Sequence, residues 1–208
     1  MVKFIGDVHG LFARYEKIIK EHPDTIQVGD MGVGFRRWPH GEWEANPPYD
    51  KMVHSRARFI RGNHDNPFIC AHHSQCIKDG HVEKFPDGRV VMFIGGALSI
   101  DKDYRIEDYS WWPEEELSQK CMWEIAKRYE DVRPDVMVTH DIPVAAIQNL
   151  LPISHHLWDS SRTQQFLQAL WNTHKPKLWV HGHHHISSDK VLEGTRFVCL
   201  AELEMRDL

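Results

Sequence analysis

Cysteine is scarce and unpaired in this chain of 208 residues. The four cysteines stand at positions 70, 76, 121 and 199, and no two of them form a CxxC pair. Zinc ribbons need closely spaced thiolates, and disulfide-stapled secreted domains need a denser cysteine framework, so the sequence excludes both classes. Free cysteines fit a reducing compartment, and we expect a cytoplasmic protein.

A basic block and a long apolar run are also missing. Lysine and arginine number 25 against 30 aspartates and glutamates, which gives a formal net charge of −5. Proteins that bind nucleic acid directly carry a basic stripe, so we expect no dedicated nucleic-acid-binding patch. No apolar run approaches the roughly 20 residues of a membrane helix, and the apolar start is too short for a signal peptide. We therefore expect no membrane association, whereas the oligomeric state stays open.

Histidine and tryptophan are abundant instead, with 16 and 8 copies. Four of the histidines fall within positions 181–185. Neutral imidazole is the commonest protein ligand for transition metals, so this run predicts a metal site if other segments supply partners. The length and the 41% share of hydrophobic residues fit a single globular domain over residues 1–208.

Short apolar runs alternate with amphipathic segments, which predicts an α/β protein. We expect strands at 1–5, 25–28, 57–60, 90–94, 136–138, 178–180 and 196–200, and helices near 11–20 and 162–173. Another helix is predicted to open at Pro113, with Glu114, Glu115 and Glu116 in its first turn, because proline and acidic residues favour helix N-termini. Residues 34–56 are polar and contain prolines and tryptophans, which predicts a loop insertion near the functional site.

Five of the predicted strands are followed by polar residues of metal-binding type. They are Asp7 and His9, Asp30, Asn63 and His64, His140, and His183 and His185. In layered α/β proteins, ligands collect outside the carboxyl ends of the strands, so these side chains should converge. Carboxylate and imidazole donors without thiolates suit catalytic Mn²⁺, Fe or Zn²⁺. Without His64 there are seven donors, which are too many for one ion that keeps a free coordination position. They fit two ions that share a bridging carboxylate, an arrangement suited to displacement at phosphorus.

Five short blocks resemble, in order, the motifs of the calcineurin-like metallophosphoesterases. They are GDVHG (6–10), GDMG (29–32), GNHD (62–65), THD (139–141) and GHHH (182–185). The segment GGALSID (95–101) also resembles a segment of some bacterial and phage members. The resemblance implies the four-layer fold of that family, in which a central β-sandwich of mixed sheets is flanked by helices. Composition and periodicity alone predict only an α/β protein.

The resemblance also implies a role for each matching residue. Asp7, His9 and His185 would hold one metal, Asn63, His140 and His183 would hold the other, and Asp30 would bridge both. His64 would protonate the leaving group as a general acid, and Asp65 would orient it. We expect two divalent ions, Mn²⁺ first, with Fe, Zn²⁺ or Ni²⁺ as alternatives. Gly182 would permit a tight turn that leaves His181 and His184 outside the ligand set.

One departure from the family pattern bears on the substrate. The protein-phosphatase branch carries Asp-Arg-Gly where this chain reads Val33-Gly34-Phe35, so its phosphate-binding arginine is missing. Arg36 or Arg37 could replace it from the adjoining loop. His155 and His156 are most simply surface residues, although their loop could rim the site.

The sequence thus favours a phosphoesterase acting on a small-molecule or nucleotide phosphomonoester or phosphodiester, by attack of a metal-bridging hydroxide. Two alternatives remain open: a serine/threonine phosphoprotein phosphatase, and a catalytically silent metal-stabilised scaffold of the same fold. A mononuclear oxygenase would instead need two histidines and one carboxylate, without the histidine of GNHD.

Overall fold

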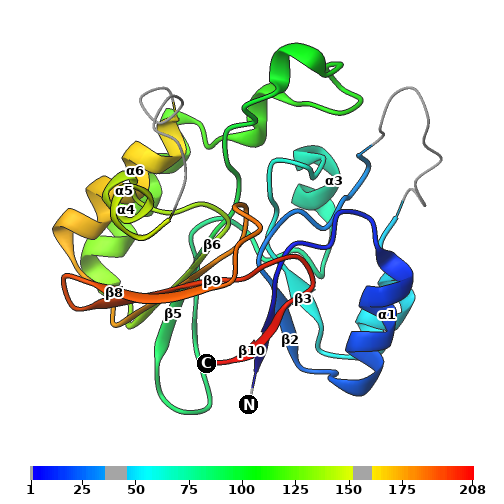
Figure 1. Cartoon of the computed structure of the whole chain (residues 1–208), viewed down its shortest axis with the longest axis horizontal. Helices are drawn as coiled ribbons and strands as arrows, with labels where there is room; N and C mark the ends of the chain where they lie inside the picture. Colours follow the sequence, from blue (N-terminus) through cyan, green and yellow to red (C-terminus); the bar gives the residue numbers. More distant parts are fainter. Residues whose placement is uncertain (1, 36–45, 152–160) are drawn as a thin grey trace.

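Two mixed β-sheets lie face to face between two layers of helices (Figure 1). The structure is a computed structural model that describes residues 2–35, 46–151 and 161–208. The first sheet has the order β10-β1-β2-β3 and contains β1 (Lys3–Ile5), β2 (Thr25–Gln27), β3 (Arg58–Phe59) and β10 (Met205–Asp207). The second has the order β4-β5-β6-β7-β9-β8 and contains β4 (His81–Lys84), β5 (Val90–Ile94), β6 (Val136–Thr139), β7 (Leu178–His181), β8 (Ser188–Leu192) and β9 (Thr195–Cys199).

The central strands of each sheet run parallel. Strands β1, β2 and β3 are parallel neighbours, and so are β5, β6, β7 and β9. All seven predicted strands are present. The strands that the sequence pattern did not predict, β4, β8 and β10, pair antiparallel at or near the sheet edges. Their side chains are largely exposed, so they lack the apolar runs that mark a buried strand.

Three apolar clusters fill the three interfaces between the four layers. Alternate residues of β5 show the arrangement: Val91 and Phe93 pack toward the first sheet, whereas Met92 and Ile94 pack against the helices. The third cluster joins the other face of the first sheet to its own helices. Because β5 is buried on both faces, its sequence is a continuous apolar run. The packing confirms the α/β class and the four layers that the resemblance implied.

Helices cover the outer face of each sheet (Figure 1). The first sheet carries α1 (Phe12–Glu21), α2 (Tyr49–His54) and α3 (Pro67–His72), and the second carries α4 (Gln119–Val132), α5 (Val144–Leu150) and α6 (Arg162–Thr173). Helix α6 has the predicted bounds, and the Ser161 hydroxyl caps it by accepting from the backbone N–H of Gln164. In the described part of the chain, no helix has the length and apolar character needed to cross a membrane.

The helix predicted to open at Pro113 begins six residues later. Residues Pro113–Glu115 form a short 3₁₀ turn, and α4 starts at Gln119, where the Ser118 hydroxyl accepts from the N–H of Cys121. Glu115 is turned inward and accepts hydrogen bonds from Ser99. Its carboxylate is occupied by the buried donors of Ser99, so it does not interact with a helix N-terminus.

The prediction that residues 34–56 form a loop is also wrong in part. Residues 49–54 form helix α2, and Met52 of this helix is fully buried in the cluster that contains α1. Residues 36–45 lie outside the described part of the chain.

Candidate metal centre

The loops that follow β1, β2, β3, β6 and β7 bring the predicted ligands together. Two overlapping groups of metal-type donors result: one of Asp7, His9, Asp30 and His185, and one of Asp30, His140 and His183. In each group, one candidate ligand atom per residue lies within 4.8 Å of all the others. Asp30 belongs to both groups, which is the position of a bridging carboxylate. The seventh predicted ligand, Asn63, joins the second group through a 3.1 Å contact between its Oδ1 and Nε2 of His140.

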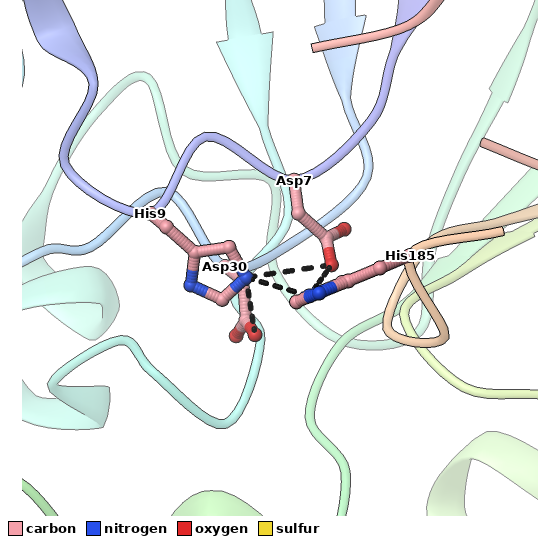
Figure 2. Close-up of side chains that lie close together, drawn as sticks. All are labelled: Asp7, His9, Asp30 and His185. Atoms are coloured by element: carbon pink, nitrogen blue, oxygen red, sulfur yellow. Dashed lines mark hydrogen bonds and ion pairs between the residues drawn. The ribbon is translucent and has the colours of Figure 1, made fainter. Parts of the chain in front are cut away.

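In the first group, the side chains point at a common space (Figure 2). The Nε2 atoms of His9 and His185 are 2.8 Å apart, and Nε2 of His185 is 3.1 Å from Oδ2 of Asp7. His9 Nε2 also lies 3.7 Å from a carboxylate oxygen of both Asp7 and Asp30. Two imidazole nitrogens bound to one cation at about 2.0–2.1 Å are about 3 Å apart, so this spacing fits a shared ion.

In the second group, hydrogen bonding orients the His140 ring. The ring is fully buried, and its Nδ1 lies 2.9 Å from the carbonyl oxygen of Val28. A carbonyl only accepts, so Nδ1 carries a proton and Nε2 is the nitrogen left to bind a metal, once a metal displaces any proton on it. That Nε2 lies 3.3 Å from Oδ1 of Asp30. His140 therefore presents the nitrogen that a metal would need toward the shared carboxylate.

Backbone strain is concentrated at these residues. Among the described residues other than glycine, eight have a positive φ, and four of these are His9, Asp30, His183 and His185. A left-handed backbone is costly for side chains with a Cβ and persists where the surrounding structure enforces it, which is common at functional sites. Half of the strained positions thus carry predicted ligands.

Two glycines of the sequence blocks leave room for the carboxylates. A Cβ on Gly182 would lie 2.1 Å from Oδ1 of Asp7, and a Cβ on Gly62 would lie 2.1 Å from Oδ1 of Asp30. The tight turn predicted at Gly182 is present, because the N–H of His184 donates to the Gly182 carbonyl oxygen over 2.8 Å. The positive φ belongs to His183, however, and Gly182 itself is needed for its close approach to Asp7.

The charges of the buried groups are compatible with a bound cation. Burial opposes ionisation of Asp7 and Asp30, but the surrounding imidazoles hold the pKa of both carboxyls well below the usual range. In the same way, burial would lower the pKa of His140, whereas Asp30 and Asp7 raise it to about 10. Burial lowers the pKa of His183 to about 3, so this ring is neutral and available as a ligand. Buried carboxylates with neutral nitrogen donors fit divalent metal ions, whose charge would replace the histidine protons.

His64 lies at the edge of this cluster, but its partners differ from those predicted. Its ring stacks on Phe35 at a centroid distance of 4.7 Å, and its Nε2 is 2.6 Å from a guanidinium nitrogen of Arg105. Burial is the main cause that lowers the pKa of His64 to about 4, against the attraction of Asp30. The backbone N–H of His64 donates to Oδ1 of Asp30 over 2.7 Å, which ties its position to the shared carboxylate.

The prediction that Asp65 orients the His64 ring is wrong in this structure. The Asp65 carboxylate is fully buried and accepts hydrogen bonds from the backbone N–H groups of Met31, Gly32, Val33 and Gly62. These bonds fix the loop after β2 to the loop after β3, so Asp65 holds the two loops that carry Asp30 and Asn63. The family resemblance suggested a partnership that the geometry of the loops does not provide.

The other two histidines of the 181–185 run, His181 and His184, lie outside the donor groups, as predicted. His181 is buried, with its Nδ1 3.1 Å from the Gly182 carbonyl oxygen, and His184 lies 3.2 Å from Asp141. Neither belongs to the two donor groups. Four residues considered in the sequence, Arg36, Arg37, His155 and His156, lie outside the described part of the chain.

Sequence reasoning missed two residues, Ser99 and Arg105. The Ser99 hydroxyl accepts from Nδ2 of Asn63 over 3.0 Å and from the Arg105 guanidinium over 3.0 Å. Their segment did carry a signal, because GGALSID ends at Asp101, and Arg105 follows four residues later in an ion pair with it.

The family model of the calcineurin-like phosphoesterases matches residues 1–187, and the chain belongs to that family. Metallophosphoesterases of this family use divalent metals, and the two donor groups are candidate sites for them. A search among curated proteins found no match.

Solved structures share the fold at low sequence identity. Protein TT1561 of Thermus thermophilus is 14% identical with a TM-score of 0.53, over 97% of this chain and 89% of that one. A protein assigned as a 5′-nucleotidase from Staphylococcus aureus is 13% identical with a TM-score of 0.58, over 97% of this chain but only 48% of that one. GAP50, the anchor in the inner membrane complex of Plasmodium, is 9% identical with a TM-score of 0.52, over 96% of this chain and 71% of that one.

Proposed function

We propose that the protein is a phosphoesterase that works with two divalent metal ions. The observation that carries the proposal is the position of Asp30, whose carboxylate belongs to both donor groups. Asp7, His9 and His185 would hold one ion, Asn63, His140 and His183 the other, and Asp30 both. When bound, the two cations supply a nucleophile at neutral pH and neutralise charge on the phosphoryl group.

The chain itself would bind the substrate and supply a proton. His64 stands at the cavity beside the donor groups, and we assign it to protonate the leaving alkoxide. A phosphoryl group bound next to the imidazole would favour its charged form, because a nearby negative charge raises a histidine pKa. The hydrogen bond from the backbone N–H of His64 to Asp30 would keep the imidazole at a fixed position relative to the bound phosphoryl group.

A cavity of about 510 Å³ lies over the cluster and is lined by His9, Asp30, His64, Arg105 and His185 among others. This volume is in the range of sites for small molecules, which supports a small-molecule or nucleotide phosphoester as substrate. Oxygen and nitrogen donors without a thiolate support Mn²⁺ as the first choice, with Fe, Zn²⁺ or Ni²⁺ as alternatives. We retain the expectation of a cytoplasmic location.

Two alternatives have less support. The protein could be a serine/threonine phosphoprotein phosphatase, but the arginine of Asp-Arg-Gly is absent after Gly32. A silent scaffold is favoured by the fold shared with GAP50, a protein described as an anchor. A metal-stabilised scaffold would use the donor set but would have no need of His64 at the cavity beside it, which favours the enzyme.

The test is hydrolysis of p-nitrophenyl phosphate and bis-p-nitrophenyl phosphate by metal-stripped protein during a Mn²⁺ titration. We expect turnover to return with about two equivalents of metal. Asp30→Asn should lose at least one metal and nearly all turnover. Asp108→Asn is the matched control, because Asp108 also has a positive φ but stands outside both donor groups, and it should behave as the wild type. Two bound metals without turnover of either ester would favour the scaffold.

A further inference from the structure

Arg105 occupies the wall shared by two cavities over the candidate metal centre. One cavity has a volume of about 540 Å³ and the other about 510 Å³, and both are lined by His9, His64, Asp101, Arg105 and His185. Among the described residues that line them, Arg105 is the single lysine or arginine. It is therefore the one fixed positive side chain that a ligand in this space would meet in the described part of the chain.

The guanidinium is held in place from behind. Its Nη1 donates to the Ser99 hydroxyl over 3.0 Å, and the guanidinium carbon lies 5.4 Å from the centre of the Phe35 ring. The Arg105 side chain is only 9% exposed. A cationic group buried to this degree on an aromatic face and a hydroxyl is pre-organised, so a ligand would not have to order a flexible side chain.

Nη2 of the same guanidinium has two partners, and the uncharged one can be displaced by an anion. It lies 2.6 Å from Oδ1 of Asp101, whose side chain is half exposed, and 2.6 Å from Nε2 of His64. The imidazole is a neutral acceptor in this pairing, since arginine can only donate. A phosphoryl oxygen carries charge and forms a stronger hydrogen bond with a guanidinium than a neutral nitrogen does. An arriving phosphate would therefore take this donor and leave the His64 ring free.

We propose that Arg105 binds the substrate's phosphoryl group and makes the enzyme prefer phosphomonoesters to phosphodiesters. The inference rests on the proposed phosphoesterase function. A monoester has one more non-bridging oxygen and one more negative charge than a diester. A buried guanidinium that is not a metal ligand could bind this additional oxygen and pair with the additional charge. Arg105 would thus take the place of the arginine missing after Gly32.

Ser99 gives this assignment a structural basis. Its hydroxyl oxygen accepts hydrogen bonds of 3.0 Å from both Arg105 and Asn63, so one atom fixes the guanidinium relative to a predicted metal ligand. A phosphate bound by Arg105 would in this way be placed relative to the donor groups. An arginine whose only task was to secure the loop would not need this link to Asn63.

The experiment compares Arg105→Ala and Arg105→Lys with the wild type in the Mn²⁺-loaded protein. With p-nitrophenyl phosphate, we expect Arg105→Ala to raise KM by about tenfold or more, because hydrogen bonds to charged groups are strong. With bis-p-nitrophenyl phosphate, kcat/KM should change less than about threefold, so that the preference for the monoester collapses. The KM of Arg105→Lys should lie between those of the wild type and Arg105→Ala, since lysine keeps the charge but not the planar fork.

A binding measurement gives a second readout that does not depend on turnover. Inorganic phosphate, titrated into the Mn²⁺-loaded protein by calorimetry, should bind Arg105→Ala about tenfold more weakly than the wild type. Arg196→Ala is the control, because Arg196 pairs with Asp189 on β8 and β9 and lines neither cavity. It should leave phosphate affinity and both esterase activities unchanged.

The outcomes separate the two proposals. Wild-type protein that hydrolyses neither ester with metal bound would contradict the phosphoesterase function itself. An active wild type whose KM, substrate preference and phosphate affinity survive Arg105→Ala would overturn the role of Arg105 alone, and would direct attention to Arg36 and Arg37. If Arg105→Ala fails to retain its metals, Arg105→Gln, which keeps most of the side-chain volume, decides by the same criteria.

Discussion

The side-chain amide of Asn63 donates a hydrogen bond of 3.0 Å to the hydroxyl of Ser99. The hydroxyl donates its own proton to Oε2 of Glu115, at a distance of 2.5 Å, so it faces Asn63 only as an acceptor. This chain of donors fixes which end of the amide faces Ser99 and leaves Oδ1 of Asn63 pointing at His140, 3.1 Å away. An amide oxygen is a metal ligand and an amide nitrogen is not, so Ser99 decides whether Asn63 can serve as one.

Ser99→Ala should therefore weaken metal binding. Without the hydroxyl, the Asn63 amide is free to turn, and loss of such supporting bonds typically costs 10- to 100-fold in metal affinity. We expect the weaker of the two Mn²⁺ affinities to fall by about tenfold in a calorimetric titration. Ser74→Ala, at an exposed serine, is the control. An unchanged affinity in Ser99→Ala would mean that Asn63 is oriented by other means or is not a ligand.

His64→Ala should keep both metals but lose rate, because His64 lies outside the two donor groups. A general acid contributes about 10²–10⁴-fold, and its contribution grows as the leaving group becomes more basic. Rates should thus fall little with p-nitrophenyl phosphate and steeply with alkyl phosphates, measured as kcat over a series of leaving groups. The exposed His72→Ala serves as control. An unchanged rate on an alkyl phosphate would remove His64 from the role of acid.

Gly182→Ala should damage the metal centre beyond its effect on the backbone. The added Cβ would lie 2.1 Å from Oδ1 of Asp7, a fully buried predicted ligand. We expect Mn²⁺ affinity to fall at least about tenfold, as for a displaced ligand. Gly194→Ala is the comparison, because its φ of +84° costs about 1 kcal/mol of strain with no atom within 4 Å. Equal metal affinity in both variants would contradict the close-approach argument.

The ion pair of Arg58 and Glu83 should contribute to stability in a pH-dependent way. Two hydrogen bonds of 2.7 and 2.8 Å join β3 of the first sheet to β4 of the second. Burial alone would raise the pKa of Glu83, but Arg58 lowers it below the ordinary value of 4.5. A lowered folded-state pKa means that the stabilisation is fully present above about pH 4.5 and is lost as the pH falls through the folded-state value.

Glu83→Gln should accordingly reduce the free energy of unfolding by about 0.5–1 kcal/mol at pH 7. The difference from the wild type should shrink as the pH drops below about 4.5 and should be lost once Glu83 is protonated in the folded protein. Urea unfolding at pH 7, 5 and 3 measures both effects. Glu193→Gln, at a more exposed pair with Lys175, should change little at any pH. A penalty for Glu83→Gln that stays constant down to pH 3 would contradict the assignment.

Much of this protein can be derived from residues that act locally. Buried strands such as β5 are apolar throughout because both faces are covered, so their positions are visible in the sequence. Helix α6 has both its cap, Ser161, and its apolar face in consecutive residues, and its bounds follow from them. The predicted ligands could be named because each follows an apolar run at the carboxyl end of a strand.

The rest depends on partners that are distant along the chain. Glu115 looked like a helix start, but Ser99, 16 residues away, takes its carboxylate. Asp65 looked like a partner for His64, yet backbone amides some 30 residues earlier occupy it. Arg105 reaches His64 across 41 positions. A side chain's chemistry is fixed by its type, so the sequence could indicate a metal centre. Which donor meets which acceptor depends on how loops fold over the sheets, and only the tertiary structure decides it.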